Sequence, residues 1–261
     1  MASRDRNFDD LSERFARNIY GSSKGEIRLA IVWQHLLKTL PQLTANRPLR
    51  ILDAGCGFGQ LGLRLTPLGH KLVLNDLSEK VLSEARKQFS QQQPEAEVKF
   101  LHLPVQSLSV DELGQFDLVL FHAVLEWLAQ PKQTLKELLG LIKPGGHLSL
   151  MFYNRDALIF RNLMRGNWRK VESGMLQGEE GGLTPYHPLS LQEVEGWLQE
   201  WHMSVLSHAG VRVIYDYMEK RLRDSRPLEE TVRVELKYAC QEPYLHLGRY
   251  LHVVAEKREL G

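Results

Sequence analysis

The sequence has few of the features that mark extracellular, membrane or metal-binding proteins. It contains two cysteines, Cys56 and Cys240, which are too few for a disulfide framework or a four-cysteine metal site. It has no run of roughly 18 apolar residues, and residues 1–17 carry charges throughout. The formal net charge of +1 gives no overall field that points to a nucleic acid or a membrane. We therefore expect a cytoplasmic protein with no signal peptide, no membrane association and no metal.

The chain of 261 residues is long enough for one large domain but leaves little room for a second independent core. Its apolar and charged fractions are ordinary for a globular protein. We find no internal repeat, and the oligomeric state stays open. Changes in the pattern divide the single domain into a helical cap, a cofactor-binding core, a lid or substrate insertion, and C-terminal strands and helices: 1–48, 49–153, 154–189 and 190–261.

The most informative segment is a glycine loop that follows an apolar run. Residues 49–59 read Leu-Arg-Ile-Leu-Asp-Ala-Gly-Cys-Gly-Phe-Gly, so the run ends at Asp53 before three alternate glycines. Glycine accepts positive φ angles and lets a ligand approach the backbone closely. A second apolar run, 71–75, is followed by Asp76. A glycine loop followed by a strand-terminal acid indicates a site for a ribose-bearing cofactor.

Two cofactor classes compete for this site. Gly57-Phe-Gly59-Gln-Leu-Gly62 can be aligned with a dinucleotide fingerprint. The other register, Asp53-x-Gly55-x-Gly57-x-Gly59, resembles motif I of class I S-adenosylmethionine-dependent methyltransferases. Asp53 favours the second class, because a carboxylate there would repel a diphosphate but not a ligand carrying a sulfonium and an ammonium. A nicotinamide oxidoreductase and a glycine turn that binds nothing remain the alternatives.

The order of strand-like and helical patterns predicts an α/β fold with a doubly wound sheet. Ser78 is expected to cap a helix, and Ser190-Leu-Gln-Glu193 reads as a capping box that opens another. The resemblance implies a Rossmann-like, mostly parallel seven-stranded sheet with helices on both faces and a lid insertion after the fifth strand. The expected strands are 49–53, 71–75, 98–102, 116–121, 147–153, 203–214 and 250–256.

The methyltransferase resemblance also implies roles for single residues around S-adenosyl-L-methionine. Asp76 would accept hydrogen bonds from the ribose hydroxyls, and Leu77 would lie on the adenine. Gln106 stands where many relatives have an acid, so its contact with the adenine amino group departs from the common pattern. His122 would contact the cofactor, pack, or act as a base. The predicted cofactor-binding set is Arg28, Asp53, Gly55, Cys56, Gly57, Asp76, Leu77, Val105, Gln106 and His122.

The insertion 154–189 combines glycines and prolines with a local excess of positive charge. Such a loop-rich segment often covers a substrate pocket. Its bases and Trp168 are suited to an RNA surface, where an indole ring can stack on an exposed base. A solvated basic helix face with a packed tryptophan is the alternative. The bases are Arg155, Arg161, Arg165, Arg169 and Lys170, and only Asp156 opposes them between 155 and 170.

Motifs outside the cofactor loop resemble those of bacterial tRNA 5-carboxymethoxyuridine methyltransferases over nearly the whole chain. They are Arg6-Asn-Phe-Asp-Asp, Asn18-Ile-Tyr-Gly21, Phe121-His-Ala-Val-Leu-Glu-Trp127, Leu148-Ser-Leu-Met-Phe-Tyr-Asn154, Gly210-Val-Arg-Val213, Gln241-Glu-Pro-Tyr and Leu247-Gly-Arg-Tyr250. The resemblance implies methyl transfer from S-adenosylmethionine to the carboxylate of 5-carboxymethoxyuridine at the tRNA wobble position, which forms a methyl ester.

A carboxylate acceptor is already ionised at neutral pH, so this reaction requires alignment and no general base. Cations and hydroxyl donors near the reacting oxygen would hold it. The candidates for this role are Tyr153, Asn154, Arg212, Tyr215 and Arg249. The alternatives are a small-molecule O-methyltransferase, which would share every cofactor feature, and a non-catalytic S-adenosylmethionine-binding scaffold. Which tRNAs would be served stays open.

Overall fold

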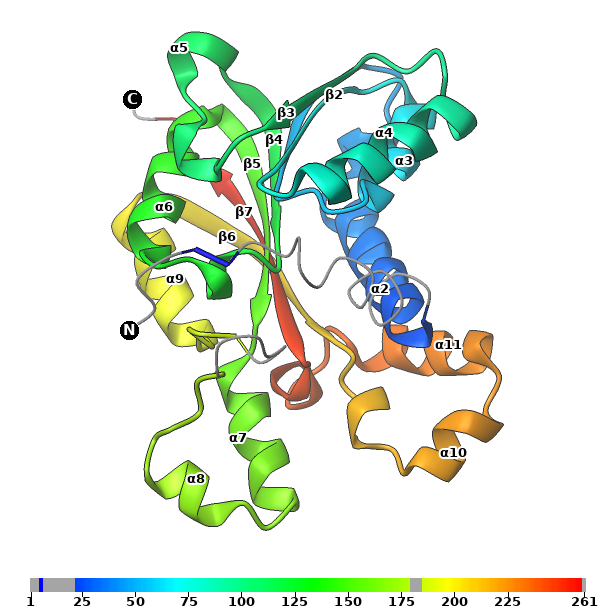
Figure 1. The fold of residues 1–261 in the computed structure, drawn as a ribbon, viewed down its shortest axis with the longest axis vertical. Coiled ribbons are helices and arrows are strands. Elements are labelled where there is room, and N and C mark those ends of the chain that lie inside the picture. The colour runs from blue at the N-terminus through cyan, green and yellow to red at the C-terminus, as the bar shows by residue number, and fades with distance from the viewer. Residues whose placement is uncertain (1–4, 7–21, 179–184, 260–261) are drawn as a thin grey trace.

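A twisted seven-stranded sheet organises the protein (Figure 1). The computed structural model describes residues 5–6, 22–178 and 185–259. The sheet order is β3-β2-β1-β4-β5-β7-β6, with β7 antiparallel to both neighbours and the other pairings parallel. This confirms the predicted α/β, mostly parallel sheet. The strands are β1 (Arg50–Ala54), β2 (Lys71–Asp76), β3 (Val98–His102), β4 (Phe116–His122), β5 (Ile142–Tyr153), β6 (Met203–Val211) and β7 (Tyr250–Lys257).

Helices cover both faces of the sheet, because successive residues of each strand point to opposite sides. Ile51 packs in the cluster formed with α2, α3 and α4, whereas Leu52 packs with α6 and α9. Figure 1 shows these two layers on either side of the sheet. The helices are α2 (Ser23–Thr39), α3 (Gln60–Leu65), α4 (Glu79–Gln92), α5 (Val110–Leu113), α6 (Pro131–Leu138), α7 (Arg155–Met164), α8 (Trp168–Glu172), α9 (Leu191–Glu200), α10 (Lys220–Ser225) and α11 (Leu228–Tyr238).

Local signals in the sequence account for several helix starts. The Ser78 hydroxyl accepts a hydrogen bond from the Val81 amide at 3.3 Å, as expected of an N-cap. Ser190 and Glu193 form the predicted capping box, with the Glu193 amide bound to the Ser190 hydroxyl and the Ser190 amide bound to the Glu193 carboxylate.

Two predicted strand ends were wrong, and each error has a backbone cause. Strand β5 begins at Ile142 and not at 147, because Ile142 pairs with Phe116 before the Pro-Gly-Gly segment bulges out of register. Strand β6 ends at Val211 and not at 214, because Arg212 has a positive φ of 62°. The buried Glu235 then accepts hydrogen bonds from the amides of 213–215 and holds this segment in a tight turn.

The predicted loop-rich insertion contains two helices, α7 and α8, among its described residues. Residues 179–184 of the insertion and 18–21 of the N-terminal motifs lie outside the described residues, so the division of the chain into four parts remains a prediction. Among residues 5–6, 22–178 and 185–259, no helix is both long and apolar enough to cross a membrane.

The carboxyl ends of the parallel strands meet at one edge of the sheet. Asp53 and Asp76 lie at the ends of β1 and β2, and His122 ends β4. Strand β7 starts at this edge, because Tyr250 pairs with Tyr153 on β5 and with Val211 on β6. Residues far apart in the sequence are therefore brought together where ligands bind in open α/β sheets.

Candidate functional site

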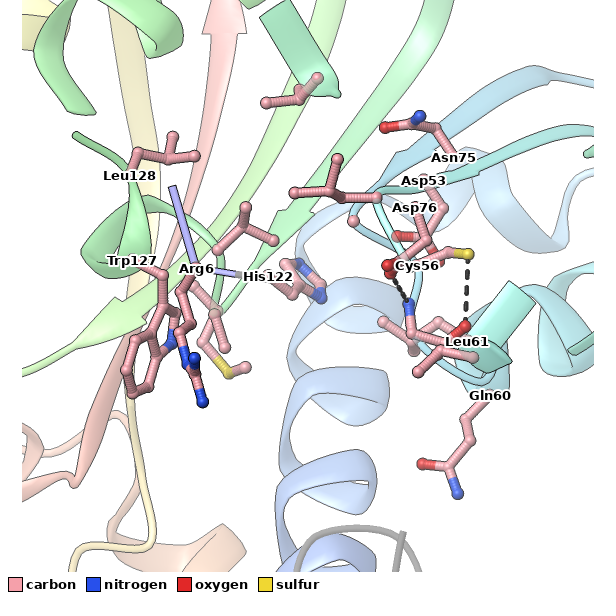
Figure 2. A pocket seen from close by; sticks show the side chains of 18 of the residues that line it. Arg6, Asp53, Cys56, Gln60, Leu61, Asn75, Asp76, His122, Trp127 and Leu128 are labelled. Atoms are coloured by element: carbon pink, nitrogen blue, oxygen red, sulfur yellow. Dashed lines mark hydrogen bonds between the residues drawn. The ribbon is translucent and has the colours of Figure 1, made fainter. Parts of the chain in front are cut away.

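A pocket of about 1170 Å³, measured out to its open mouth, lies at this edge (Figure 2). Every residue that the sequence analysis assigned to the cofactor lines it: Arg28, Asp53, Gly55, Cys56, Gly57, Asp76, Leu77, Val105, Gln106 and His122. The structure thus brings the predicted set together in one cavity, while their individual contacts with a cofactor remain predictions.

The glycine loop forms one wall of the pocket and requires glycine. Gly55 and Gly57 have φ angles of 74° and 57°, in the left-handed region that side chains disfavour. A Cβ atom on Gly55 would overlap the side chain of Val124. Asp76 fixes the loop from the neighbouring strand, since its carboxylate accepts hydrogen bonds from the amides of Gly57 and Ser78, each at 2.9 Å.

Two carboxyl groups share the floor of the pocket. Burial, with a smaller contribution from the charge of Asp76, raises the pKa of Asp53 to about 7. A pair of nearby acids of this kind is stabilised by a positively charged ligand and destabilised by an anionic one. The floor of the pocket therefore favours a cation over a diphosphate.

Residues 5 and 6 line the pocket beside Gln106, which the sequence analysis missed. Asp5 accepts hydrogen bonds from the Ala129 amide at 2.8 Å and from the Gln106 side-chain nitrogen at 2.7 Å. The Arg6 amide donates to the Trp127 carbonyl. With its nitrogen bound to Asp5, Gln106 keeps its side-chain oxygen for a donor such as an amino group. The motif at residues 6–10 was the available sequence signal for this segment, but the resemblance implied no role for it.

The predicted acceptor residues do not line this pocket. Three of them gather in a second cluster beside it. Met151, which lines the pocket, pairs with His122, and Tyr153 lies two residues further along β5. The Tyr153 backbone is therefore roughly 8 Å from that of His122 by ordinary strand spacing. The Arg249 guanidinium lies 4.6 Å from the centre of the Tyr153 ring.

Buried hydrogen-bond donors in this second cluster lack partners. Within the described residues, neither the Tyr153 hydroxyl nor Arg249 Nη1 makes a hydrogen bond, although both atoms are buried. Arg161 Nε, which reaches the same cluster from α7, is also unbonded. Burial raises the pKa of Tyr153 to about 12, so its hydroxyl keeps its proton at neutral pH. Buried polar atoms without a protein partner are uncommon, so these donors are available to a ligand.

The charge of the second cluster is positive. Arg212 is nearly buried, and its Nε lies 3.1 Å from Asp216 Oδ2, but the angle does not meet hydrogen-bond geometry. Burial lowers the pKa of Arg161, and the charges of Arg249 and Arg165 add to this effect. Among the described groups that influence the pKa of Arg161, Asp216 is the acid whose negative charge opposes these cations. We define Tyr153, Arg161, Arg212 and Arg249 as the anion cluster.

The other two acceptor candidates, Asn154 and Tyr215, make contacts within the fold. Asn154 is fully buried; its nitrogen donates to the carbonyls of His246 and Gly248, and its oxygen caps α7 by accepting from the Asp156 amide. Its side chain is therefore fully engaged. The Tyr215 amide donates to Glu235, and the guanidinium of Arg223 lies 5.5 Å from the centre of its ring.

Glu126 is a buried acid between the pocket and the anion cluster that the sequence analysis did not single out. Its side chain is fully buried, and neither carboxyl oxygen makes a hydrogen bond within the described residues. Burial raises the pKa of Glu126 to about 8, against the opposing influence of its own amide, the Tyr153 amide and Arg28. The group is therefore mostly neutral at pH 7 and does not cancel the nearby positive charge.

Metal ligands are not part of the described site. No group of three or more His, Cys, Asp or Glu side chains in the described ranges is arranged to hold a metal ion.

Some known proteins match only the cofactor-binding part of this chain, and others match nearly all of it. Residues 52–150 match the family described as Methyltransferase domain. The ubiquinone biosynthesis O-methyltransferase of Acinetobacter baylyi is 32% identical over 41% of this chain and 44% of that protein. The tRNA 5-carboxymethoxyuridine methyltransferase of Escherichia coli K12 is 40% identical over 97% of both chains. The chain belongs to the tRNA 5-carboxymethoxyuridine methyltransferase family.

Solved structures support the same fold at low sequence identity. The magnesium protoporphyrin IX methyltransferase of Synechocystis, determined with bound S-adenosylhomocysteine, is 16% identical, with a TM-score of 0.63, and the match covers 97% of this chain and 96% of that chain. The plantazolicin methyltransferase BamL is 17% identical, with a TM-score of 0.57, over 96% of this chain and 90% of that one. Both confirm the class I methyltransferase fold predicted for this tRNA 5-carboxymethoxyuridine methyltransferase family member.

The pocket fits S-adenosyl-L-methionine, the cofactor of this family. Gly55 leaves space that a Cβ atom would fill, and Asp53 and Asp76 provide acceptors for the ammonium and hydroxyl groups of such a ligand. This agrees with the predicted cofactor class.

Proposed function

We propose that this protein transfers a methyl group from S-adenosylmethionine to the carboxylate of 5-carboxymethoxyuridine in tRNA and so forms the methyl ester. The observation that carries the proposal is the anion cluster beside the cofactor pocket, in which Tyr153, Arg161 and Arg249 have buried donor atoms without a hydrogen bond and Arg212 pairs with Asp216. The name of the Escherichia coli relative supplies the acceptor that such a cluster would suit. We expect the reaction in the cytoplasm, where tRNA is the substrate.

The cofactor residues bind and orient in this mechanism. S-adenosylmethionine supplies a methyl group made electrophilic by its sulfonium. Asp76 is expected to accept from the ribose hydroxyls and Leu77 to pack on the adenine. Gln106 and the Val105 backbone would contact the adenine edge, and Arg28 the cofactor carboxylate. Asp53 would face the positively charged end.

The anion cluster holds the acceptor in line with that methyl group. Arg249 and Arg161 would bind the carboxylate oxygens, and the protonated Tyr153 hydroxyl would donate a third hydrogen bond. The bound cofactor would supply the methyl group to an acceptor oxygen, with the electron pair of the broken carbon–sulfur bond left on sulfur. No proton is released, so the protein contributes proximity and alignment and requires no general base. Burial lowers the pKa of His122 to about 3, which leaves this ring neutral beside the site.

Cofactor affinity is expected to depend on pH through Asp53. Burial raises the pKa of this carboxyl to about 7, so it is mostly protonated at pH 6 and mostly ionised at pH 8. The ammonium group of S-adenosylhomocysteine is expected to bind the ionised form better, and this ligand should therefore bind about tenfold more tightly at pH 8 than at pH 6. Titration calorimetry measures this directly. The Asp53→Asn variant should bind more weakly with little pH dependence, and a flat wild-type profile would contradict the assignment.

A basic and aromatic surface on α7 and α8 is suited to the tRNA. Trp168 is 62% exposed, and Met164 is 72% exposed on the preceding helix. The exposed bases Arg165, Arg169 and Lys170 flank them. Exposed apolar side chains among cations fit unstacked bases and a phosphate backbone better than they fit bulk water. We propose that this surface contacts the anticodon stem-loop while the wobble base enters the anion cluster.

Charge reversal on this surface is expected to weaken tRNA binding without changing cofactor binding. The triple variant Arg165→Glu, Arg169→Glu, Lys170→Glu should raise the Kd for tRNA at least tenfold at moderate salt, because it replaces attraction to phosphates with repulsion. Filter binding measures the tRNA, and calorimetry with S-adenosylhomocysteine serves as the control. Unchanged tRNA affinity would remove α7 and α8 from the interface.

A matched pair of tRNAs tests the acceptor. One transcript carries 5-carboxymethoxyuridine at the wobble position and the other carries uridine there, and both are incubated with the enzyme and cofactor. Nucleoside mass spectrometry should show one added methyl group only in the first. Methylation of both tRNAs would move the acceptor elsewhere in the RNA. Absence of methylation in both, with turnover of phenols or small carboxylic acids, would favour the small-molecule O-methyltransferase.

A further inference from the structure

A chain of buried polar side chains runs from the cofactor pocket across one face of the sheet to strand β6. His122 Nε2 lies 2.7 Å from the Ser149 hydroxyl, which lies 2.7 Å from His252 Nε2. His252 Nδ1 lies 2.8 Å from His35 Nδ1, and His35 Nε2 lies 2.8 Å from the Ser207 hydroxyl. The chain links β4, β5, β7, α2 and β6. Its members are far apart in the sequence, so no local sequence pattern could have predicted it.

This chain lies on an otherwise apolar face of the sheet. Ser149 and His252 are fully buried, and His35, a residue of α2, is 4% exposed. Their neighbours on that face include Leu120, Met151 and Val254. Polar groups in such a place are costly unless every one is hydrogen-bonded, and a satisfied network then becomes strongly specified. The chain therefore has few permitted hydrogen-bond arrangements.

Neutral imidazoles reduce these arrangements to two. Burial lowers the pKa of His122 to about 3 and of His35 to about 4, and it lowers the pKa of His252 as well, so each ring carries one N–H at neutral pH. In the first arrangement His122 Nε2 donates to Ser149, Ser149 to His252 Nε2, His252 Nδ1 to His35, and His35 Nε2 to Ser207. The second arrangement reverses every donor and acceptor along the chain.

The two arrangements offer a ligand opposite hydrogen-bonding roles at the His122 ring. His122 lines the pocket, and with Nε2 held by Ser149 its Nδ1 is the ring nitrogen left for a bound molecule (Figure 2). Nδ1 is an acceptor in the first arrangement and a donor in the second. If the ribose binds Asp76 on β2, the amino-acid end of the cofactor extends along the sheet edge toward β4, where its ammonium is a charged donor.

We propose that Ser149, His252 and His35 act as positioning residues that set the tautomer of His122, and that the cofactor ammonium selects the arrangement in which His122 Nδ1 accepts. A ligand bound at one end of the chain then fixes the hydroxyl direction of Ser207 at the other end, on strand β6. The chain transfers no net proton, which suits a reaction that releases none.

Nitrogen NMR of the full-length protein labelled with ¹⁵N-histidine tests this proposal, because ring-nitrogen shifts distinguish the two tautomers. The free protein should give shifts averaged between the two arrangements. Saturating S-adenosylhomocysteine should move all three rings together, to Nε2–H for His122 and His35 and to Nδ1–H for His252. Protonation of His122 at Nδ1 in the complex, or a set of tautomers that neither arrangement allows, would overturn the proposal.

The Ser149→Ala variant breaks the chain next to the pocket and adds a test of transmission. S-adenosylhomocysteine should bind about threefold to tenfold more weakly, and its addition should no longer shift His35 and His252. Ser204→Ala, which removes a hydroxyl on β6 outside the chain, should behave like wild type. A response of His35 and His252 in the Ser149→Ala variant would contradict coupling through this hydroxyl. Neither test uses tRNA, so the outcome is independent of the proposed acceptor.

Discussion

Replacing Arg249 by methionine should lower kcat/KM for tRNA about a hundredfold and leave the Kd for S-adenosylhomocysteine within about twofold of wild type. Arg249 Nη1 is buried without a hydrogen bond among the described residues, next to the Tyr153 ring and outside the cofactor pocket. In this variant, a carboxylate that enters the anion cluster would lack its buried cationic partner. Truncating one partner of a buried charge pair costs about 2–5 kcal/mol. Methionine keeps the packing volume, so the effect reports charge and hydrogen bonding.

Two further variants make this result specific. Arg249→Lys retains the charge without the planar fork and should recover only part of the activity. Arg258→Met is the matched control, because Arg258 follows the other end of β7, at the opposite edge of the sheet, where it donates to Ser204. The control should retain wild-type kinetics. A kcat/KM within twofold of wild type for Arg249→Met, with normal cofactor binding, would exclude Arg249 from the acceptor site.

Replacing Asp76 by asparagine should raise the Kd for S-adenosylhomocysteine about a hundredfold and abolish turnover at ordinary cofactor concentrations. The carboxylate already holds the glycine loop through the Gly57 amide and is expected to accept from both ribose hydroxyls. Asparagine keeps one acceptor oxygen but loses the charge and turns an NH2 donor toward the second hydroxyl. Each hydrogen bond to a charged group contributes about 1.5–3 kcal/mol, so the loss of one and the weakening of the other correspond to about a hundredfold. Calorimetry or a thermal-shift titration measures the change.

Asp117→Asn is the matched control for this variant. Asp117 also accepts from a strand amide, that of Arg50 at 2.8 Å, and pairs with Lys143, but it lies at the opposite edge of the sheet. Its substitution should reduce stability without changing cofactor affinity. If Asp76→Asn bound S-adenosylhomocysteine as tightly as Asp117→Asn, the ribose assignment would be wrong.

Much of the fold and the cofactor pocket could be predicted because the signals are local. The glycine loop needs positive φ angles at alternate positions, and Asp76 ends the next strand, so parallel pairing of β1 with β2 brings them together. The caps at Ser78 and Ser190 depend on residues three positions away. Such patterns determine local geometry with little influence from the rest of the chain.

The parts of the site that the sequence analysis did not predict depend on contacts between residues far apart in the sequence. Asp5 reaches Gln106 across the pocket mouth, and His35 meets His252 through the packing of α2 on the sheet. Arg161 was predicted only as part of a basic surface, but the placement of α7 turns its Nε toward the buried cluster. Asn154 was assigned to the acceptor from residue type, whereas its bonds to His246 and Gly248 depend on tertiary structure.

Alkali treatment of methylated tRNA tests the central proposal most directly. The enzyme is incubated with S-adenosylmethionine labelled in the methyl group and with tRNA that carries 5-carboxymethoxyuridine, and the purified RNA is then treated with mild alkali. A methyl ester should release the label as volatile methanol, and Arg249→Met should incorporate far less label than Arg258→Met. Label that enters the tRNA but survives alkali would place the methyl group on nitrogen, carbon or a hydroxyl and would contradict carboxylate methylation.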